Sequence, residues 1–222
     1  VRLYQQARQD AETKTRLLDE INHRVKNNLA TIVGLLYVER NHAGMEMQPI
    51  YQDIINDLIK RIEGLATAHQ MLSATQWSPL LLSDLTQQVI DSVIQALPYN
   101  KRISVALTPN RTVRVTASQA NSLAMVINEM ATNTVKYALL ERDTVAVRVS
   151  VSQQDHQITL EYHDDGPGFP DIVLQGKTHN VGLYLILNIV QHDLKGRVSL
   201  KNERGASVTI QFPVSKREGF TQ

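Results

Sequence analysis

Residues 128–137 read Asn-Glu-Met-Ala-Thr-Asn-Thr-Val-Lys-Tyr, and they lie inside a largely apolar stretch, residues 118–140, that is expected to be one long helix. Glu129, Asn133 and Lys136 recur at i, i+4 and i+7, so on an α-helix they form one polar stripe. A carboxylate, an amide and an amine on one stripe suit a divalent cation and phosphate oxygens. An ordinary amphipathic helix would carry the same stripe, so this stretch leaves both interpretations open.

A second polar block follows an expected strand. Residues 164–170 read Asp-Asp-Gly-Pro-Gly-Phe-Pro, directly after residues 158–162. Two glycines allow the backbone to approach a ligand closely. An acidic side chain can accept a hydrogen bond from an exocyclic amine such as that of adenine. A plain acidic turn is the alternative.

A third block, residues 179–185, reads His-Asn-Val-Gly-Leu-Tyr-Leu at the start of an expected helix. A helix N-terminus favours phosphate, although Gly182 could equally be a packing glycine. The chain contains neither the Gly-x-x-x-x-Gly-Lys-Ser/Thr loop nor the Gly-x-Gly-x-x-Gly fingerprint. A bound nucleotide would therefore need a different fold.

The elements around these blocks predict a mixed, layered α+β domain after a boundary at Trp77-Ser78-Pro79. Ser83 is a candidate N-cap for the first helix of this domain. Helices are expected at residues 83–97, 118–140 and 181–194, and strands at residues 103–107, 113–115, 145–151, 158–162, 198–201 and 207–212.

Residues 1–76 are expected to be helical with one break at residues 41–49. Two helices joined by a short turn form a helical hairpin. One hairpin cannot cover both of its apolar seams, so a four-helix bundle made by a dimer is the simple solution. The seam of the first helix consists of Leu18, Ile21, Val25, Leu29, Ile32 and Leu36.

His23 points nearly opposite this seam when about 100° is counted per residue. Asp19 and Asn27, one turn away on either side, share its exposed face. A neighbouring carboxylate can orient an imidazole through one nitrogen and leave the other free to attack. An ordinary surface histidine on a solvated helix fits the periodicity as well.

Composition excludes several classes of protein. The 222 residues are 42% hydrophobic and 20% charged, which is typical of a soluble globular protein. A net charge of +1 gives no strong attraction to nucleic acid or to an anionic membrane, and the absence of cysteine rules out disulfides and thiolate metal sites. No apolar run approaches the roughly 20 residues that span a bilayer. We expect a cytoplasmic fragment without membrane contact of its own, with any membrane or sensory segment upstream.

Taken in order, the blocks resemble a bacterial sensor histidine kinase over residues 15–213. The matching motifs are His-Arg-Val-Lys-Asn-Asn-Leu at 23–29, Asn-Glu-x-x-x-Asn-x-x-Lys-Tyr at 128–137, Asp-x-Gly-x-Gly at 164–168 and Val-Gly-Leu at 181–183. The first motif is similar to that of the subfamily whose phosphoacceptor histidine is followed by arginine. The resemblance implies a dimerising helical hairpin, residues 1–76, and an α/β sandwich, residues 77–222, of the kind shared with gyrase and Hsp90 ATPases.

The resemblance also implies roles for individual residues. His23 matches the phosphoacceptor, Asn133 the asparagine that ligates Mg²⁺, and Asp164 the aspartate that reads the adenine amine. Residues 171–180 match the mobile lid over the phosphates. The other positions matched to the nucleotide pocket are Lys136, Tyr137, Gly166, Gly168, Gly182 and Thr209.

The chain departs from many such kinases at Arg24, where an acidic residue usually follows the histidine. The duty of general base then falls to Asp19, Glu20 or Glu129.

In related kinases a polar residue at the position of Asn27 supports removal of phosphate from the receiver aspartate. A plain surface role for Asn27 is the alternative.

These matches predict a homodimeric protein-histidine kinase that uses ATP and Mg²⁺ to phosphorylate His23 and passes the phosphoryl group to an aspartate of a response-regulator receiver domain. A phosphotransfer or scaffold protein with a dead nucleotide site is a rival, but the intact Asn133, Asp164, Gly166 and Gly168 argue against it. An ATPase or serine kinase of the same superfamily, such as an anti-sigma factor, is another. Those proteins lack a helical hairpin with an exposed histidine box.

Overall fold

The computed structural model describes residues 49–74, 78–108, 112–177 and 181–215. The chain divides into two compact units, Val1–Trp77 and Ser78–Gln222. The expectations that concern the first helix, including His23, Asn27 and the candidate bases Asp19 and Glu20, lie outside the described residues.

The described part of the first unit is helix α2, Pro49–Ala74. Pro49 suits the first position of this helix, because its ring presets φ and its missing N–H would have no partner in the first turn. Among the described residues of the whole chain, no helix is both long enough and apolar enough to cross a membrane.

The second unit is built on a five-stranded sheet in the order β2-β4-β5-β7-β6, where β2 and β4 run parallel and the other neighbours run antiparallel. The small strands β1 and β3 form a separate antiparallel pair. The strands are β1 (Leu80–Leu81), β2 (Arg102–Thr108), β3 (Arg114–Val115), β4 (Thr144–Gln154), β5 (Gln157–Asp164), β6 (Arg197–Asn202) and β7 (Ala206–Pro213).

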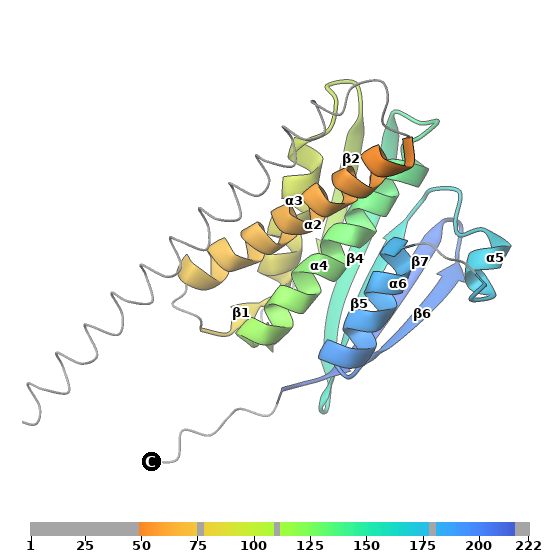
Figure 1. The fold of residues 1–222 in the computed structure, drawn as a ribbon. Coiled ribbons are helices and arrows are strands. Elements are labelled where there is room, and N and C mark those ends of the chain that lie inside the picture. Colours follow the sequence, from red (N-terminus) through yellow and green to blue (C-terminus); the bar gives the residue numbers. More distant parts are fainter. Residues whose placement is uncertain (1–48, 75–77, 109–111, 178–180, 216–222) are drawn as a thin grey trace, which may run out of the picture. The chain divides into compact units, whose positions relative to one another are not determined.

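Helices α3, α4 and α6 cover one face of this sheet (Figure 1). The helices of this unit are α3 (Leu82–Gln95), α4 (Ala117–Asn133), α5 (Asp171–Leu174) and α6 (Val181–Asn188), and two π-helical turns, η2 (Thr134–Ala138) and η3 (Ile189–Asp193), continue α4 and α6. An N-terminal helix followed by an α/β sandwich confirms the fold class expected from the sequence.

The core lies between the helices and the sheet. Alternate side chains of β4 are buried, from Val145 to Val151, whereas the residues between them face away from the helices. The same alternation buries Ile158, Leu160 and Tyr162 of β5. Because successive side chains of a strand point to opposite faces, the period of two leaves the second face of the sheet polar.

Two helix starts differ from the sequence-based expectation. Ser83 is not an N-cap: α3 begins at Leu82, its N-cap is Leu81, and no side chain caps it. Ser83 is instead buried within the first turn. Helix α4 begins at a capping box, in which Thr116 and Gln119 each bond the other's backbone N–H.

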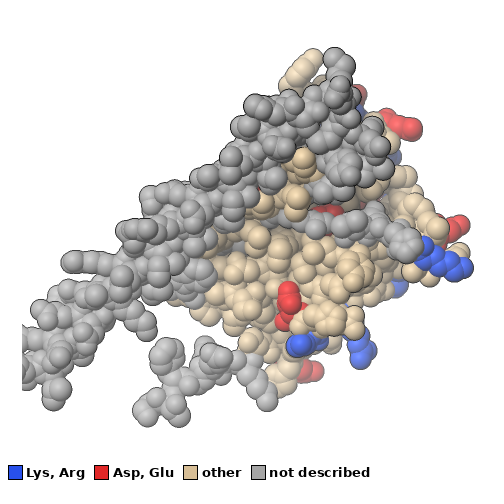
Figure 2. All heavy atoms as spheres, in the orientation of Figure 1, with Lys and Arg blue, Asp and Glu red and all other residues tan. Residues whose placement is uncertain are grey.

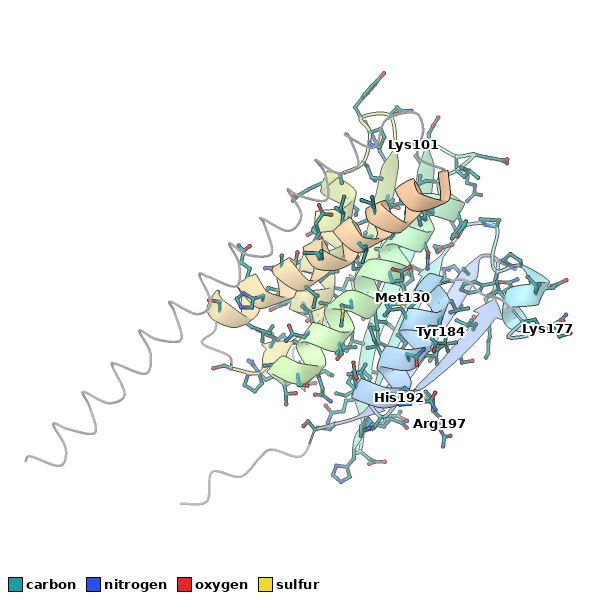
Figure 3. The ribbon with its side chains drawn as sticks, in the orientation of Figure 1. Lys101, Met130, Lys177, Tyr184, His192 and Arg197 are labelled. Carbon is teal, nitrogen blue, oxygen red and sulfur yellow. The ribbon has the colours of Figure 1, made fainter. Side chains whose placement is uncertain are left out.

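The long helix expected at residues 118–140 is α-helical only as far as Asn133 and then changes to the π turn η2. Lys101, labelled in Figure 3, stabilises the chain just after this turn. Its Nζ donates to the carbonyl oxygens of Leu139, at 3.1 Å, and Arg142, at 2.6 Å. A lysine ammonium near the last carbonyls of a helix also interacts favourably with the helix dipole.

Candidate functional site

A cavity of about 600 Å³ opens within the second unit, between the end of α4, the start of α6, the strands β5 and β7, and the loop after β5. Most of its wall is apolar. Apart from two tyrosines, the polar side chains in this wall are those of Asn133 and Asp164. The lining residues are Met130, Asn133, Tyr137, Ala138, Leu140, Tyr162, Asp164, Pro167, Gly168, Phe169, Pro170, Ile172, Val173, Leu183, Ile186, Ala206 and Val208. A wall of this kind fits a flat apolar ring with one or two polar anchors.

Asp164, at the end of β5, is 7% exposed and sits in a hydrogen-bonded network. Thr134 Oγ1 donates to Asp164 Oδ2 at 2.9 Å, and the Gly166 backbone N–H donates to Asp164 Oδ1 at 3.0 Å. The Tyr162 hydroxyl lies 3.0 Å from Thr134 Oγ1. Because the single hydroxyl proton of Thr134 goes to Asp164, Tyr162 is the donor in that third bond.

Burial raises the pKa of Tyr162 well above its usual value, and the nearby charge of Asp164 raises it further, while the hydrogen bond with Thr134 acts in the opposite direction. The phenol therefore keeps its proton throughout the physiological range.

The loop after β5 forms one rim of the cavity, and Asn202 of β6 holds it. Asn202 Oδ1 accepts the backbone N–H of Phe169 at 2.7 Å, and Asn202 Nδ2 donates to the Phe169 carbonyl at 2.9 Å. Gly168 has φ of +82°, and a Cβ there would lie 2.7 Å from Asn202 Oδ1. A side chain at residue 168 would thus be strained and would also push against the asparagine.

Gly166 allows the same loop to lie against η2, because a Cβ at this position would be 2.5 Å from the Cβ of Ala138. The neighbouring Asp165 does not line the cavity and instead bonds Ala146 and Arg142. Its Oδ1 accepts the N–H of Ala146 at 2.9 Å, and Arg142 Nη1 donates to its carbonyl oxygen at 2.6 Å. The two adjacent aspartates therefore do different work, with Asp164 directed to the cavity and Asp165 anchoring the loop.

The structure brings four of the predicted site residues together on the cavity wall, namely Asn133, Tyr137, Asp164 and Gly168. Gly166 lies directly behind them, where its N–H bonds Asp164. Gly182 is buried in the first turn of α6, next to Leu183, which lines the cavity.

Three other candidate residues are not among those that line the cavity. Glu129 is buried within α4. Lys136 lies within the π turn η2, of which Tyr137 and Ala138 line the cavity. Thr209 follows Val208 on β7, and since Val208 faces the cavity, Thr209 points to the opposite face of the sheet.

The segment expected to be a lid, residues 171–180, is described as far as Lys177. It begins with the short helix α5, whose Ile172 and Val173 line the cavity. Lys177 projects from the end of this segment (Figure 3). On the face that Figure 2 shows, most of the described surface is uncharged, with one acidic group inside this area and the other charged side chains toward its edges.

Sequence reasoning missed Thr134, Tyr162 and Asn202. Thr134 was part of a quoted motif, but nothing in its spacing indicated a partner in β5. The only signal for Tyr162 was a tyrosine at a core position of an alternating strand, because a buried phenol usually has a hydrogen-bond partner.

Comparisons with known families match both regions of the chain. The family model described as "Histidine kinase" matches residues 20–97. The model described as "Histidine kinase-, DNA gyrase B-, and HSP90-like ATPase" matches residues 118–216, the region that contains all the lining residues of the cavity.

Curated relatives carry the same description. The chain is 26% identical over 219 residues to the sensor histidine kinase PdtaS of Mycolicibacterium smegmatis, which covers 95% of this chain and 42% of PdtaS. It is 25% identical over 209 residues to the blue-light-activated histidine kinase 2 of Erythrobacter litoralis, covering 91% of this chain and 58% of that protein. The chain thus spans 42% and 58% of the length of these two relatives.

Among solved structures, the histidine kinase domain of the Erythrobacter litoralis EL346 blue-light activated histidine kinase matches with a TM-score of 0.58 and 22% identity. The match covers 93% of this chain and 94% of that domain. At this identity the likeness establishes the fold alone.

Proposed function

Because this chain belongs to the sensor histidine kinases, with an ATPase domain of the gyrase and Hsp90 type at its C-terminal end, we propose that it is an ATP-dependent protein-histidine kinase that phosphorylates His23. The observation that carries this proposal is the placement of Asn133 and Asp164 on the wall of one largely apolar cavity within the matched ATPase region.

Asp164 is suited to recognise adenine. Its two carboxylate oxygens offer about four lone-pair sites, of which Thr134 and Gly166 occupy one on each oxygen. The remaining sites can accept the exocyclic amine of adenine. Met130, Ile186 and Val208 supply apolar contacts for a purine ring beside the carboxylate.

Mg²⁺ fits this site through Asn133, whose side-chain oxygen is a ligand type that magnesium accepts. In the part of the chain that the structure describes, no group of three or more histidine, cysteine, aspartate or glutamate side chains could hold a metal. The ion would therefore depend on Asn133 together with the phosphate oxygens of ATP, and it would supply neutralisation of their charge.

In the proposed reaction a nitrogen of His23 attacks the γ-phosphorus of ATP, the bond to the bridging oxygen breaks, and ADP leaves. The family model over residues 20–97 and the box at residues 23–29 support His23 as the acceptor. Since Glu129 is buried in α4 and is not among the lining residues, Asp19 and Glu20 are the better candidates for the general base.

The finer parts of the proposal follow the same family. Residues 1–76 dimerise as a four-helix bundle, and residues 77–222 bind ATP. Phosphohistidine then donates its phosphoryl group to the aspartate of a receiver domain, and Asn27 assists later removal of that phosphate. We place this activity in the cytoplasm.

Incubation with γ-labelled ATP and Mg²⁺ tests the proposal directly. The wild-type chain should acquire acid-labile label, as phosphohistidine does, and His23→Gln should acquire none while still binding ATP. His156→Gln is a matched control, because this exposed histidine lies in the β4–β5 turn. Label that persists in His23→Gln, or that resists acid, would contradict the assignment.

A further inference from the structure

We propose that Thr134 is a positioning residue which, held by Tyr162, aims the Asp164 carboxylate so that the cavity accepts a 6-amino purine and rejects a 6-oxo purine. This inference rests on the proposed nucleotide function and adds the source of its base selectivity. It concerns residues from two elements, the π turn η2 and the strand β5.

The contacts form a chain in which the direction of every proton is determined. Tyr162 donates to Thr134 at 3.0 Å, Thr134 donates to Asp164 Oδ2 at 2.9 Å, and the Gly166 N–H donates to Asp164 Oδ1 at 3.0 Å. All three side chains are buried, and Thr134 is 1% exposed. Inside a low-dielectric wall such a network is rigid, because breaking any bond leaves a buried polar group unpaired.

Tyr162 completes this chain of hydrogen bonds at its far end. A threonine hydroxyl could donate to the phenol and accept from elsewhere, which would turn its proton away from Asp164. Because Thr134 gives its hydroxyl proton to Asp164, its oxygen is left to accept the hydrogen of the Tyr162 phenol. The bond from Tyr162 then opposes any rotation of the Thr134 hydroxyl away from the carboxylate.

Thr134 acts from behind the wall, since it is not among the lining residues, whereas Asp164 is. The two donors to Asp164 therefore use lone pairs on the protein side. The free lone pairs that reach the cavity can only accept. A 6-amino group donates a hydrogen bond to these lone pairs. A 6-oxo group is itself an acceptor, so neither its oxygen nor the Asp164 oxygen gains a hydrogen-bond partner.

The π turn η2 begins at Thr134, the residue that bonds Asp164. In a continuous α-helix the backbone would turn more tightly after Asn133, whereas η2 runs from Thr134 to Ala138 and closes with the Leu139 N–H on the Thr134 carbonyl at 3.1 Å. Single π turns inside α-helices are frequent at functional sites. Here the turn begins at the residue that holds Asp164.

The experiment compares the dissociation constants of ATP and of inosine triphosphate, which carries a 6-oxo group, for the full chain and four variants. Thr134→Val removes the hydroxyl at constant shape, Thr134→Ser keeps it, and Tyr162→Phe removes the upstream donor. Thr86→Val is the matched control, because Thr86 is a fully buried threonine of α3 whose hydroxyl bonds the Leu82 carbonyl.

We expect the wild type to bind ATP more tightly than inosine triphosphate. In Thr134→Val the ratio of the two dissociation constants should shrink roughly tenfold, which corresponds to the loss of one charge-assisted hydrogen bond. Thr134→Ser should stay within about twofold of the wild type, Tyr162→Phe should lose about threefold, and Thr86→Val should lose none. Thermal unfolding of each variant checks that it is folded. If Thr134→Val does not fold, the loss in Tyr162→Phe and its absence in Thr86→Val decide the question.

Selectivity that is unchanged in Thr134→Val, or lost equally in Thr134→Ser and Thr86→Val, would overturn the role of Thr134. In that case ATP binding that still depends on Asp164 would leave the proposed function standing. A wild-type chain that binds neither nucleotide would defeat both the proposed function and this inference.

Discussion

Asn202 of β6 and Phe169 of the loop after β5 are joined by two reciprocal hydrogen bonds, of 2.7 Å and 2.9 Å, in which the asparagine side chain pairs with the phenylalanine backbone as a neighbouring strand would. Phe169 and the adjacent Pro170 line the cavity. The sheet thus holds the rim of the site through one side chain.

Replacing Asn202 by alanine should loosen this rim without unfolding the sheet. Two hydrogen bonds at an exposed position are lost, which should cost about 1–2 kcal/mol at most. We expect ATP affinity to fall severalfold and the Phe169 amide to exchange with deuterium faster. Ser150→Ala is the control, because Ser150 bonds Glu161 on the opposite face of the sheet. Unchanged exchange at Phe169 would show that the pairing does not restrain the loop.

Replacing Asn133 by alanine should weaken ATP binding only when Mg²⁺ is present. The amide oxygen is the proposed protein ligand of the ion, so its removal should raise the dissociation constant of Mg-ATP by about tenfold. With EDTA the variant and the wild type should bind alike, as isothermal titration can measure. Asn188→Ala, on α6 and outside the cavity lining, is the control. An equal loss with and without the metal would instead indicate direct contact with the nucleotide.

Tyr162 should make the protein less stable in alkali. Its pKa in the folded chain is raised above the unfolded value of about 10. The stabilisation is therefore complete below about pH 10, and above it the unfolded chain releases a proton that the folded chain keeps. The free energy of unfolding should fall by up to about 1.4 kcal/mol for each further pH unit.

Tyr162→Phe lacks this proton, so its free energy of unfolding should fall less steeply above pH 10, although it is lower at neutral pH by about 1 kcal/mol for the lost hydrogen bond. Urea unfolding at a series of pH values measures both curves. Tyr99→Phe, at a side chain that is 99% exposed, should follow the wild type. Parallel curves for the wild type and Tyr162→Phe would contradict the prediction.

Local patterns in the sequence were sufficient for the architecture and the family. A strand was expected at residues 145–151, and the structure confirms it within β4. The order of the motifs at residues 23–29, 128–137 and 164–168 predicted a histidine kinase, which the family models confirm. Patterns of this kind are readable because side-chain direction repeats regularly within one element.

The same periodicity gave no sign of the π turn η2. It treats residues 118–140 as one α-helix, whereas a π turn takes over at Thr134 and rotates every later side chain relative to Asn133. Helical spacing could not indicate this change, because the residues of the turn fit an α-helix equally well. Ser83 is not the N-cap of α3 because the helix already begins at Leu82, which is buried in the core.

From the sequence alone one derives which residues face the core and which motifs accompany one another, because both follow from local spacing. Only the tertiary structure pairs Thr134 with Asp164, 30 residues away, and Asn202 with Phe169, 33 residues away. These contacts depend on how a helix end, a strand end and a loop pack against one another. Spacing within an element carries no information about the distance between elements. The tertiary structure was therefore needed to identify Thr134, which bonds Asp164, and Asn202, which holds the rim of the cavity.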